Sequence, residues 1–334
     1  PLDPSDDISD SVEVLFYSNV TAGAGDQTIT HYWRTNTYDK YTGAAYGTEV
    51  DMHIAQQIST PYSNSTDLAD SAFVSSDVTW EVSFESPLEQ PQIIPMPAYV
   101  SQISVWSDAS GEVMRTNGTH RYNVSANIIS SYTAVAPEHD YDWATNSVNS
   151  VPSTLSPYEL ETDNKFNDPL DAYYIVKTTT DDVIANAAAT DAYTKLMAIR
   201  EYLRGEAGTD FQRNYDGSNL QDGDDIAYHL IANSQEGTCS EFNSAFVTMS
   251  RLAGLPTRVV TGYKGGTWHG AGYTVYSDDF AYWAESRISL NPTSTDMGWV
   301  PFDACPDAAE IEITNLQWSP TNYDRDGSVE VEIT

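Results

Sequence analysis

The chain has 334 residues, enough for two or three domains, and its 40% hydrophobic and 12% aromatic content is adequate for packed cores rather than disorder. Acidic residues number 49 against 15 basic ones, so the formal net charge is −34. This charge argues against binding to nucleic acid and against adhesion to anionic lipid, because both are themselves negatively charged.

The first part of the chain has the pattern of strands. Residues 11–135 alternate between polar and apolar types and are rich in Val, Ile, Tyr and Thr, with turn clusters such as 22–26 and 116–119 between the runs. We expect an all-β, sandwich-like domain over residues 1–135. Asn-x-Ser/Thr sequons in this region, together with the acidic composition, favour an extracellular glycoprotein; they are Asn19, Asn64, Asn117 and Asn123.

Residues 136–178 hold scattered Pro, Ser, Asn and Asp and are interpreted as a linker with short turns. After it, Thr190 or Asp191 could cap a helix that stops at Gly205. One face of that helix is apolar and consists of Ala192, Leu196, Ile199 and Leu203. A further short helix is expected over residues 226–231.

Cys239 is the most informative residue in the chain. The apolar residues that follow it step by four, three and four, which predicts a helix with one buried face: Phe242, Phe246, Met249 and Ala253. The cysteine therefore sits at a helix N-terminus, where the helix dipole favours a thiolate, and it is a candidate nucleophile. The alternative is a buried cysteine that acts as a small hydrophobic residue.

Further segments follow this helix in a recognisable order. Residues 254–263 read Gly-Leu-Pro-Thr-Arg-Val-Val-Thr-Gly-Tyr, a later strand contains Trp283 and Glu285, and residues 298–303 read Gly-Trp-Val-Pro-Phe-Asp. Together with Cys239, these segments resemble the transglutaminase-like (papain-related) superfamily over about residues 180–306. Residues 31–43 also resemble a stretch in a membrane-anchored subfamily, in which an extracytoplasmic β domain precedes the cysteine-bearing domain.

The resemblance implies an α+β fold. We expect a β-sandwich-like extracellular domain at 1–135, a linker at 136–178, a transglutaminase-like domain at 179–306, and the start of a further β module or a β extension at 307–334. It also implies a place at the cell surface, with the membrane reached only through segments outside this chain.

One position departs from the family pattern. Trp283 and Glu285 align with the family's histidine strand, and Ala281 then occupies the position of the catalytic histidine. A cysteine nucleophile needs a base, and a third group to orient that base. Asp303 matches the family's orienting aspartate, and His269, in a glycine-rich stretch, is the candidate substitute base. The alternative for His269 is a solvated loop residue.

The two cysteines are the only ones in the chain. In the family fold the aspartate strand runs beside the nucleophile helix, so the resemblance implies that Cys239 and Cys305 could form a disulfide. Such a bond would convert the nucleophile into a cross-link, and the alternative is two free thiols.

The function hypotheses fall into three classes. The preferred one is a catalytically inactive transglutaminase-like protein with a structural or interaction role, its partners being other cell-surface proteins or itself. The second is an active cysteine protease or acyltransferase that uses Cys239, Asp303 and His269. The third is a calcium-dependent adhesion module, because Asn322, Asp324 and Asp326 mimic the opening of a calcium loop; no other cofactor is expected.

The acidic composition also bears on the source of the protein. Molar salt would screen the repulsion among so many carboxylates, so a salt-loving organism is expected, with a haloarchaeon as first choice. The competing account of the charge is an acidic, calcium-binding surface protein.

Overall fold

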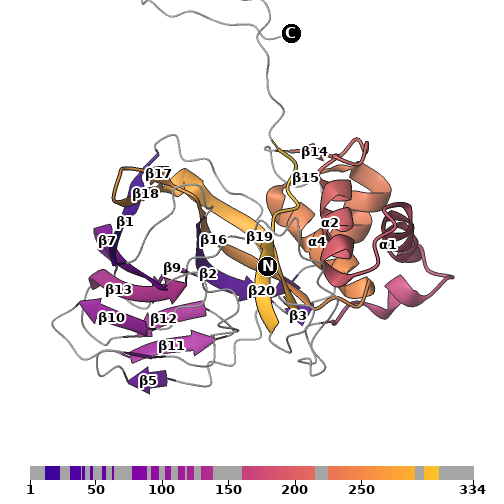
Figure 1. Ribbon diagram of the computed structural model, residues 1–334. Coiled ribbons are helices and arrows are strands. Elements are labelled where there is room, and N and C mark those ends of the chain that lie inside the picture. The colour runs from indigo at the N-terminus through magenta and orange to yellow at the C-terminus, as the bar shows by residue number, and fades with distance from the viewer. Residues whose placement is uncertain are drawn as a thin grey trace, which may run out of the picture.

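The computed structural model describes residues 12–22, 31–38, 40–41, 46–47, 55–57, 62–63, 77–88, 92–97, 102–106, 112–116, 119–123, 129–137, 160–214, 225–289 and 297–307. Strands occupy one half of the molecule and helices the other, with the long strands β16, β19 and β20 between them (Figure 1). The expected α+β class is confirmed.

A seven-stranded antiparallel sheet forms the outer wall of the β-rich half. Its order is β17-β18-β1-β7-β13-β10-β6. The strands are β1 (Val14–Ala22), β6 (Tyr62–Ser63), β7 (Asp77–Leu88), β10 (Gln102–Trp106), β13 (Ile129–Pro137), β17 (Thr267–Trp268) and β18 (Gly272–Tyr276).

A five-stranded antiparallel sheet has the order β20-β19-β16-β2-β9. Its strands are β2 (Tyr32–Tyr38), β9 (Met96–Pro97), β16 (Thr257–Lys264), β19 (Phe280–Ser289) and β20 (Met297–Phe302). Each large sheet therefore combines strands from residues 1–135 with strands from residues 179–306.

Three smaller sheets complete the described strands. One has the order β5-β11-β12-β8, and the other two pair β3 with β4 and β14 with β15. The bounds are β3 (Lys40–Tyr41), β4 (Tyr46–Gly47), β5 (Ala55–Gln57), β8 (Gln92–Ile93), β11 (Glu112–Thr116), β12 (Thr119–Asn123), β14 (Gln212–Arg213) and β15 (Glu236–Gly237).

The α-helices are α1 (Tyr174–Asn186), α2 (Ala192–Leu203), α3 (Ile226–Tyr228) and α4 (Cys239–Leu252). Shorter turns of helix are η1 (Asn164–Asn167), the π-helix η2 (His229–Ser234) and η3 (Ser277–Asp279). The helix expected after Asp191 is confirmed as α2, with Asp191 forming a capping box and Gly205 adopting φ +77° beyond its end.

Helix α1 differs from the sequence-based expectation, because it begins within the segment 136–178 that was interpreted as a linker. Only Val176 and Thr180 of its residues are fully buried, so its apolar pattern is weak. The helix packs against α2 and α4, and this tertiary packing stabilises it.

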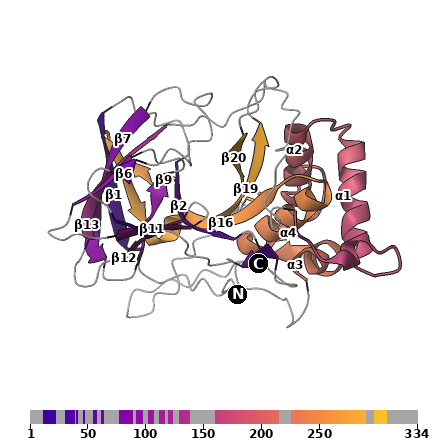
Figure 2. The ribbon, with the colours of Figure 1, turned by 90° about the horizontal axis from the view of Figure 1, so that it is seen from below.

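Two hydrophobic cores flank the five-stranded sheet. One lies between the two large sheets and includes Phe16, Trp33, Trp80 and Tyr132, as a sandwich requires. The other lies between the five-stranded sheet and the helices, which cover it on the opposite side in Figure 2. No helix of the described ranges is long and apolar enough to cross a membrane.

Candidate functional site

Helix α4 sets the position of Cys239 at the edge of the second core. Its N-cap residue Thr238 accepts a hydrogen bond from the Glu241 N–H, and the Glu241 carboxylate accepts one from the Thr238 N–H at 2.7 Å. A Cβ on Gly237 would lie 3.0 Å from both Glu241 Oε2 and Leu230 Cδ1. Glycine therefore lets the chain pass close to the start of the helix.

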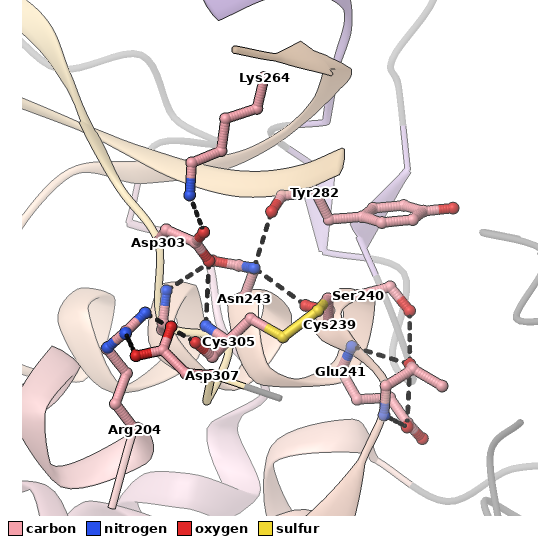
Figure 3. Close-up of a disulfide and its surroundings, with 12 residues drawn as sticks. Arg204, Cys239, Ser240, Glu241, Asn243, Lys264, Tyr282, Asp303, Cys305 and Asp307 are labelled. Carbon is pink, nitrogen blue, oxygen red and sulfur yellow. Dashed lines mark hydrogen bonds and ion pairs between the residues drawn. A yellow bond between two sulfur atoms is a disulfide. The ribbon is translucent and has the colours of Figure 1, made fainter. Parts of the chain in front are cut away.

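The expected disulfide is present in the structure. Cys239 is bonded to Cys305, with the two Cα atoms 4.8 Å apart (Figure 3). The bond closes a sequence separation of 66 residues, and on the chain-entropy model such a cross-link stabilises the folded state by about 4 kcal/mol. The sulfur at the N-terminus of α4 is therefore part of a cross-link.

Asn243 connects three parts of the site from the next turn of α4. Its side-chain amide donates to the carbonyl of Cys239 at 2.9 Å and to the carbonyl of Tyr282 at 3.0 Å. Its Oδ1 accepts from the N–H of Ala304 at 3.1 Å. The start of α4, strand β19 and the segment after β20 are thus held together by one buried side chain, which the sequence pattern did not single out.

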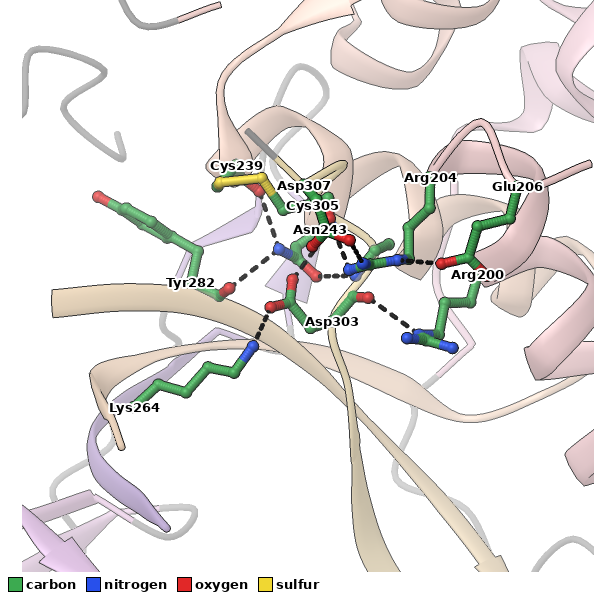
Figure 4. Close-up of polar contacts among 11 residues, drawn as sticks. Arg200, Arg204, Glu206, Cys239, Asn243, Lys264, Tyr282, Asp303, Cys305 and Asp307 are labelled. Atoms are coloured by element: carbon green, nitrogen blue, oxygen red, sulfur yellow. Dashed lines mark hydrogen bonds and ion pairs between the residues drawn. A yellow bond between two sulfur atoms is a disulfide. The ribbon is translucent and has the colours of Figure 1, made fainter. Parts of the chain in front are cut away.

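Asp303 is engaged by local structure and by a lysine. One oxygen, Oδ1, accepts from the N–H of Cys305 at 3.0 Å, and the other, Oδ2, forms an ion pair with the ammonium group of Lys264 (Figure 4). The Asp303 carbonyl also accepts from Nε of Arg200 at 3.1 Å. Burial raises the pKa of the Tyr32 phenol well above its ordinary value, and the negative charge of the Asp303 carboxylate raises this pKa further.

Lys264 was missed by sequence reasoning, although a signal for it existed. It is the last residue of β16 and follows directly the Gly-Tyr pair that ends the segment 254–263. Lys264 is the first residue beyond the family pattern of this strand, so that pattern does not indicate its contact with Asp303.

Ala281 lies in β19 opposite Gly262 of β16. Gly262 allows the neighbouring strands to approach, because a Cβ there would lie 2.0 Å from the carbonyl oxygen of Trp33. His269 directly follows β17, is exposed, and belongs to the hairpin at the edge of the seven-stranded sheet. In Figure 1 this hairpin and helix α4 lie on opposite sides of the molecule.

Glu285 anchors the strand that carries Ala281. It is 2% exposed and bonds Arg34 of β2 at 2.6 Å and Arg258 of β16 at 2.7 Å. Burial alone would raise the pKa of Glu285, but the two guanidinium groups lower it overall. The ring of Trp299 stacks on Arg258, and Cζ of Arg258 lies 3.9 Å from the centre of that ring. The triad of Glu285, Arg34 and Arg258 ties β2, a strand from the first 135 residues, to the site.

The remaining predicted sites are described only in part. Asn19 lies in β1 between β7 and β18, with a half-buried side chain, and Asn123 ends β12. Asn64, Asn117 and the candidate calcium residues Asn322, Asp324 and Asp326 lie outside the described residues. Among the residues that are described, no cluster of three His, Cys, Asp or Glu side chains could hold a metal ion.

Comparison with known proteins assigns the region around Cys239. Residues 177–304 match the model of the transglutaminase-like superfamily, which confirms the resemblance for this part of the chain. A segment of 120 residues is 28% identical to the uncharacterized protein YebA of Bacillus subtilis (strain 168), and it covers 33% of this chain and 15% of YebA.

One solved structure resembles the fold over most of the chain. It is the periplasmic domain of TgpA from Pseudomonas aeruginosa, with a TM-score of 0.54 and 16% identity; the match covers 88% of this chain and 90% of that one. The strand-rich region and the helical region therefore occur together in another protein of this fold.

Proposed function

We propose that this protein is a catalytically inactive, transglutaminase-like module with a structural or interaction role outside the cell, at the surface of a salt-loving organism. The observation that carries the proposal is the Cys239–Cys305 bond, because a sulfur bound to another sulfur is no nucleophile. Two further observations support it. Ala281 has no basic group, and the Lys264 ammonium has donors but no acceptor for a thiol proton.

The extracellular location rests on independent support. The disulfide would persist in an oxidising compartment, and the solved structure with a similar fold is described as periplasmic. The net charge of −34 supports a high-salt environment, in which carboxylates repel one another less. The sequons and membrane anchoring through neighbouring segments belong to the same proposal.

A second candidate function is a cysteine protease or acyltransferase that works only after reduction. The retention of both Cys239 at a helix N-terminus and Asp303 favours it. In such an enzyme Cys239 would attack an amide carbonyl, and His269 would have to move from its hairpin on the other side of the molecule to serve as the base.

The test is an activity assay on the native protein in molar salt, with and without reductant. Hydrolysis of casein and incorporation of a fluorescent amine into a glutamine-containing protein cover both amide reactions. We expect neither in either state. Turnover after reduction that disappears in Cys239→Ser would establish the enzyme instead, and loss of that turnover in His269→Ala would identify the base.

A further inference from the structure

The two cysteines of the disulfide differ in their exposure to solvent. Cys305 is 5% exposed, and the preceding Ala304 is fully buried. Cys239, on the first turn of α4, is only half-buried. A thiol from solution can approach the sulfur of Cys239 more readily than that of Cys305, and access decides which sulfur is attacked in thiol–disulfide exchange.

The surroundings also favour the opened state of this bond. Helix α4 has 14 residues, and the positive end of its dipole lies at Cys239. The Asp303 carboxylate adds no net negative charge to the same site, because the Lys264 ammonium balances it. A disulfide whose reduced form is stabilised in this way is more easily opened than a purely structural one.

The backbone of Cys305 is fixed independently of the sulfur bond. Its N–H donates to Asp303 Oδ1 at 3.0 Å, and its carbonyl accepts from Nη1 of Arg204 at 2.8 Å. These contacts would hold Cys305 next to Cys239 after the bond opens, so its sulfur stays in position to close the bond again.

From these observations we propose that Cys239–Cys305 is an exchangeable disulfide through which a thiol-bearing partner becomes covalently attached to Cys239. The partner's thiolate attacks Sγ of Cys239, the bond to Cys305 breaks, and the electron pair leaves with Sγ of Cys305. The product is a mixed disulfide at Cys239 with a thiolate at Cys305, and attack by that thiolate on Cys239 releases the partner. The inference rests on the proposed interaction role of the site.

The test uses the native, oxidised full chain and two probes, free cysteine and a short cysteine-containing peptide. After incubation, free thiols are blocked with an alkylating reagent and the modified cysteines are identified by peptide mass spectrometry. We expect the probe on Cys239 and the alkyl group on Cys305. A reaction with free cysteine alone indicates a small-molecule partner, and a reaction with the peptide indicates a polypeptide. A probe on Cys305, or an intact disulfide with both probes, would overturn the proposal.

Two matched variants, Cys305→Ser and Cys239→Ser, lack the same bond and each retain one thiol. We expect Cys239 in the first to react with a small disulfide reporter at least about tenfold faster than Cys305 in the second. Equal rates would contradict the proposed asymmetry. If the protein hydrolyses or transfers amides, the proposed inactive role is wrong, but the exchange results still stand. If no mixed disulfide forms at Cys239, only the proposed disulfide exchange is wrong.

Discussion

Lys264 is the residue that most changes the chemistry of this site. Its ammonium group contacts Asp303, the carboxylate that the family resemblance assigns to orienting a histidine. Charge is balanced in this pair, but a lysine ammonium cannot accept the proton of a thiol. The family resemblance implies a histidine at position 281, where this chain has Ala281, and Asp303 forms an ion pair with Lys264 where an acid–base couple would require a histidine.

Glu285 gives a residue-scale prediction about stability. Glu285→Gln would remove the carboxylate that pairs with both buried guanidinium groups, Arg34 and Arg258, and breaking a buried ion pair in this way costs about 3–5 kcal/mol. We expect the free energy of unfolding, measured with urea, to fall by that amount. The control is Asp181→Asn, which breaks the exposed pair with Lys177 and should cost about 0.5 kcal/mol or less. Similar losses in the two variants would contradict the role of the triad.

The residues of this site differ in how far the sequence predicts them. Cys239, Asp303 and Ala281 were predicted because they occupy positions in a family pattern, and Cys305 because it is the only other cysteine. Lys264, Asn243 and Arg34 were not, since each has a partner 39 or more residues away along the chain. The sequence marks the position of Lys264, directly after the Gly-Tyr pair, but no local pattern reports which distant residue it contacts.

At the scale of elements, Asn243 joins α4 to β19 and to the segment after β20. Asn243→Ala would leave the carbonyl of Tyr282 and the N–H of Ala304 without this partner inside the protein. Because each buried group left unpaired costs about 1–3 kcal/mol, we expect a loss of about 2–4 kcal/mol in urea unfolding. Thr248→Val removes a buried hydroxyl of the same helix that donates to the carbonyl of Ser244 one turn away, and should cost less, about 1 kcal/mol. Equal losses in the two variants would show that the connection that Asn243 makes between elements adds nothing to the free energy of unfolding.

Asp225 gives a pH-dependent prediction for the contact between β3 and α3. It caps α3 and accepts a 2.5 Å hydrogen bond from the Tyr41 hydroxyl of β3. Burial raises its pKa to about 6, against the opposing effects of Tyr41 and two backbone N–H groups, and Asp163 adds repulsion. Since the folded-state pKa lies above the ordinary value of 3.8, the folded protein binds this proton more tightly than the unfolded chain.

The contribution of Asp225 to the free energy of unfolding is therefore fully present below about pH 4 and is lost as the pH rises through about 6. The change is on the order of 3 kcal/mol. Urea unfolding of Asp225→Asn between about pH 4 and pH 7 should show a correspondingly flatter pH profile than the parent. Asp191→Asn makes the same change at the N-cap of α2 and controls for the loss of a carboxylate at a helix cap. An Asp225→Asn profile parallel to the parent's would contradict the assignment.

At the scale of the whole molecule, the sheets cross the boundary that composition suggests. The sequence predicts a β-rich first part and a helix-rich second part, because local periodicity and capping residues report elements. It does not predict that β2 pairs with β16 and β1 with β18, since strand partners more than 200 residues apart leave no mark in local pattern. The α4 site is consequently built on a sheet to which both parts contribute.

The net charge of −34 predicts that the stability of this shared structure depends on salt. Raising KCl to about 1 M shortens the Debye length to about 3 Å and screens repulsion among the surface carboxylates. We expect the melting temperature to rise with KCl, by about 2 °C for each kcal/mol of repulsion removed.

The control is a variant with fewer surface carboxylates. Asp182, Glu201 and Asp210 are exposed, so a variant carrying Asp182→Asn, Glu201→Gln and Asp210→Asn should gain less melting temperature from salt than the parent. Sorbitol, which is uncharged, should not distinguish the two proteins. A melting temperature indifferent to KCl, or equal salt gains in both proteins, would refute electrostatic repulsion as the limit on stability.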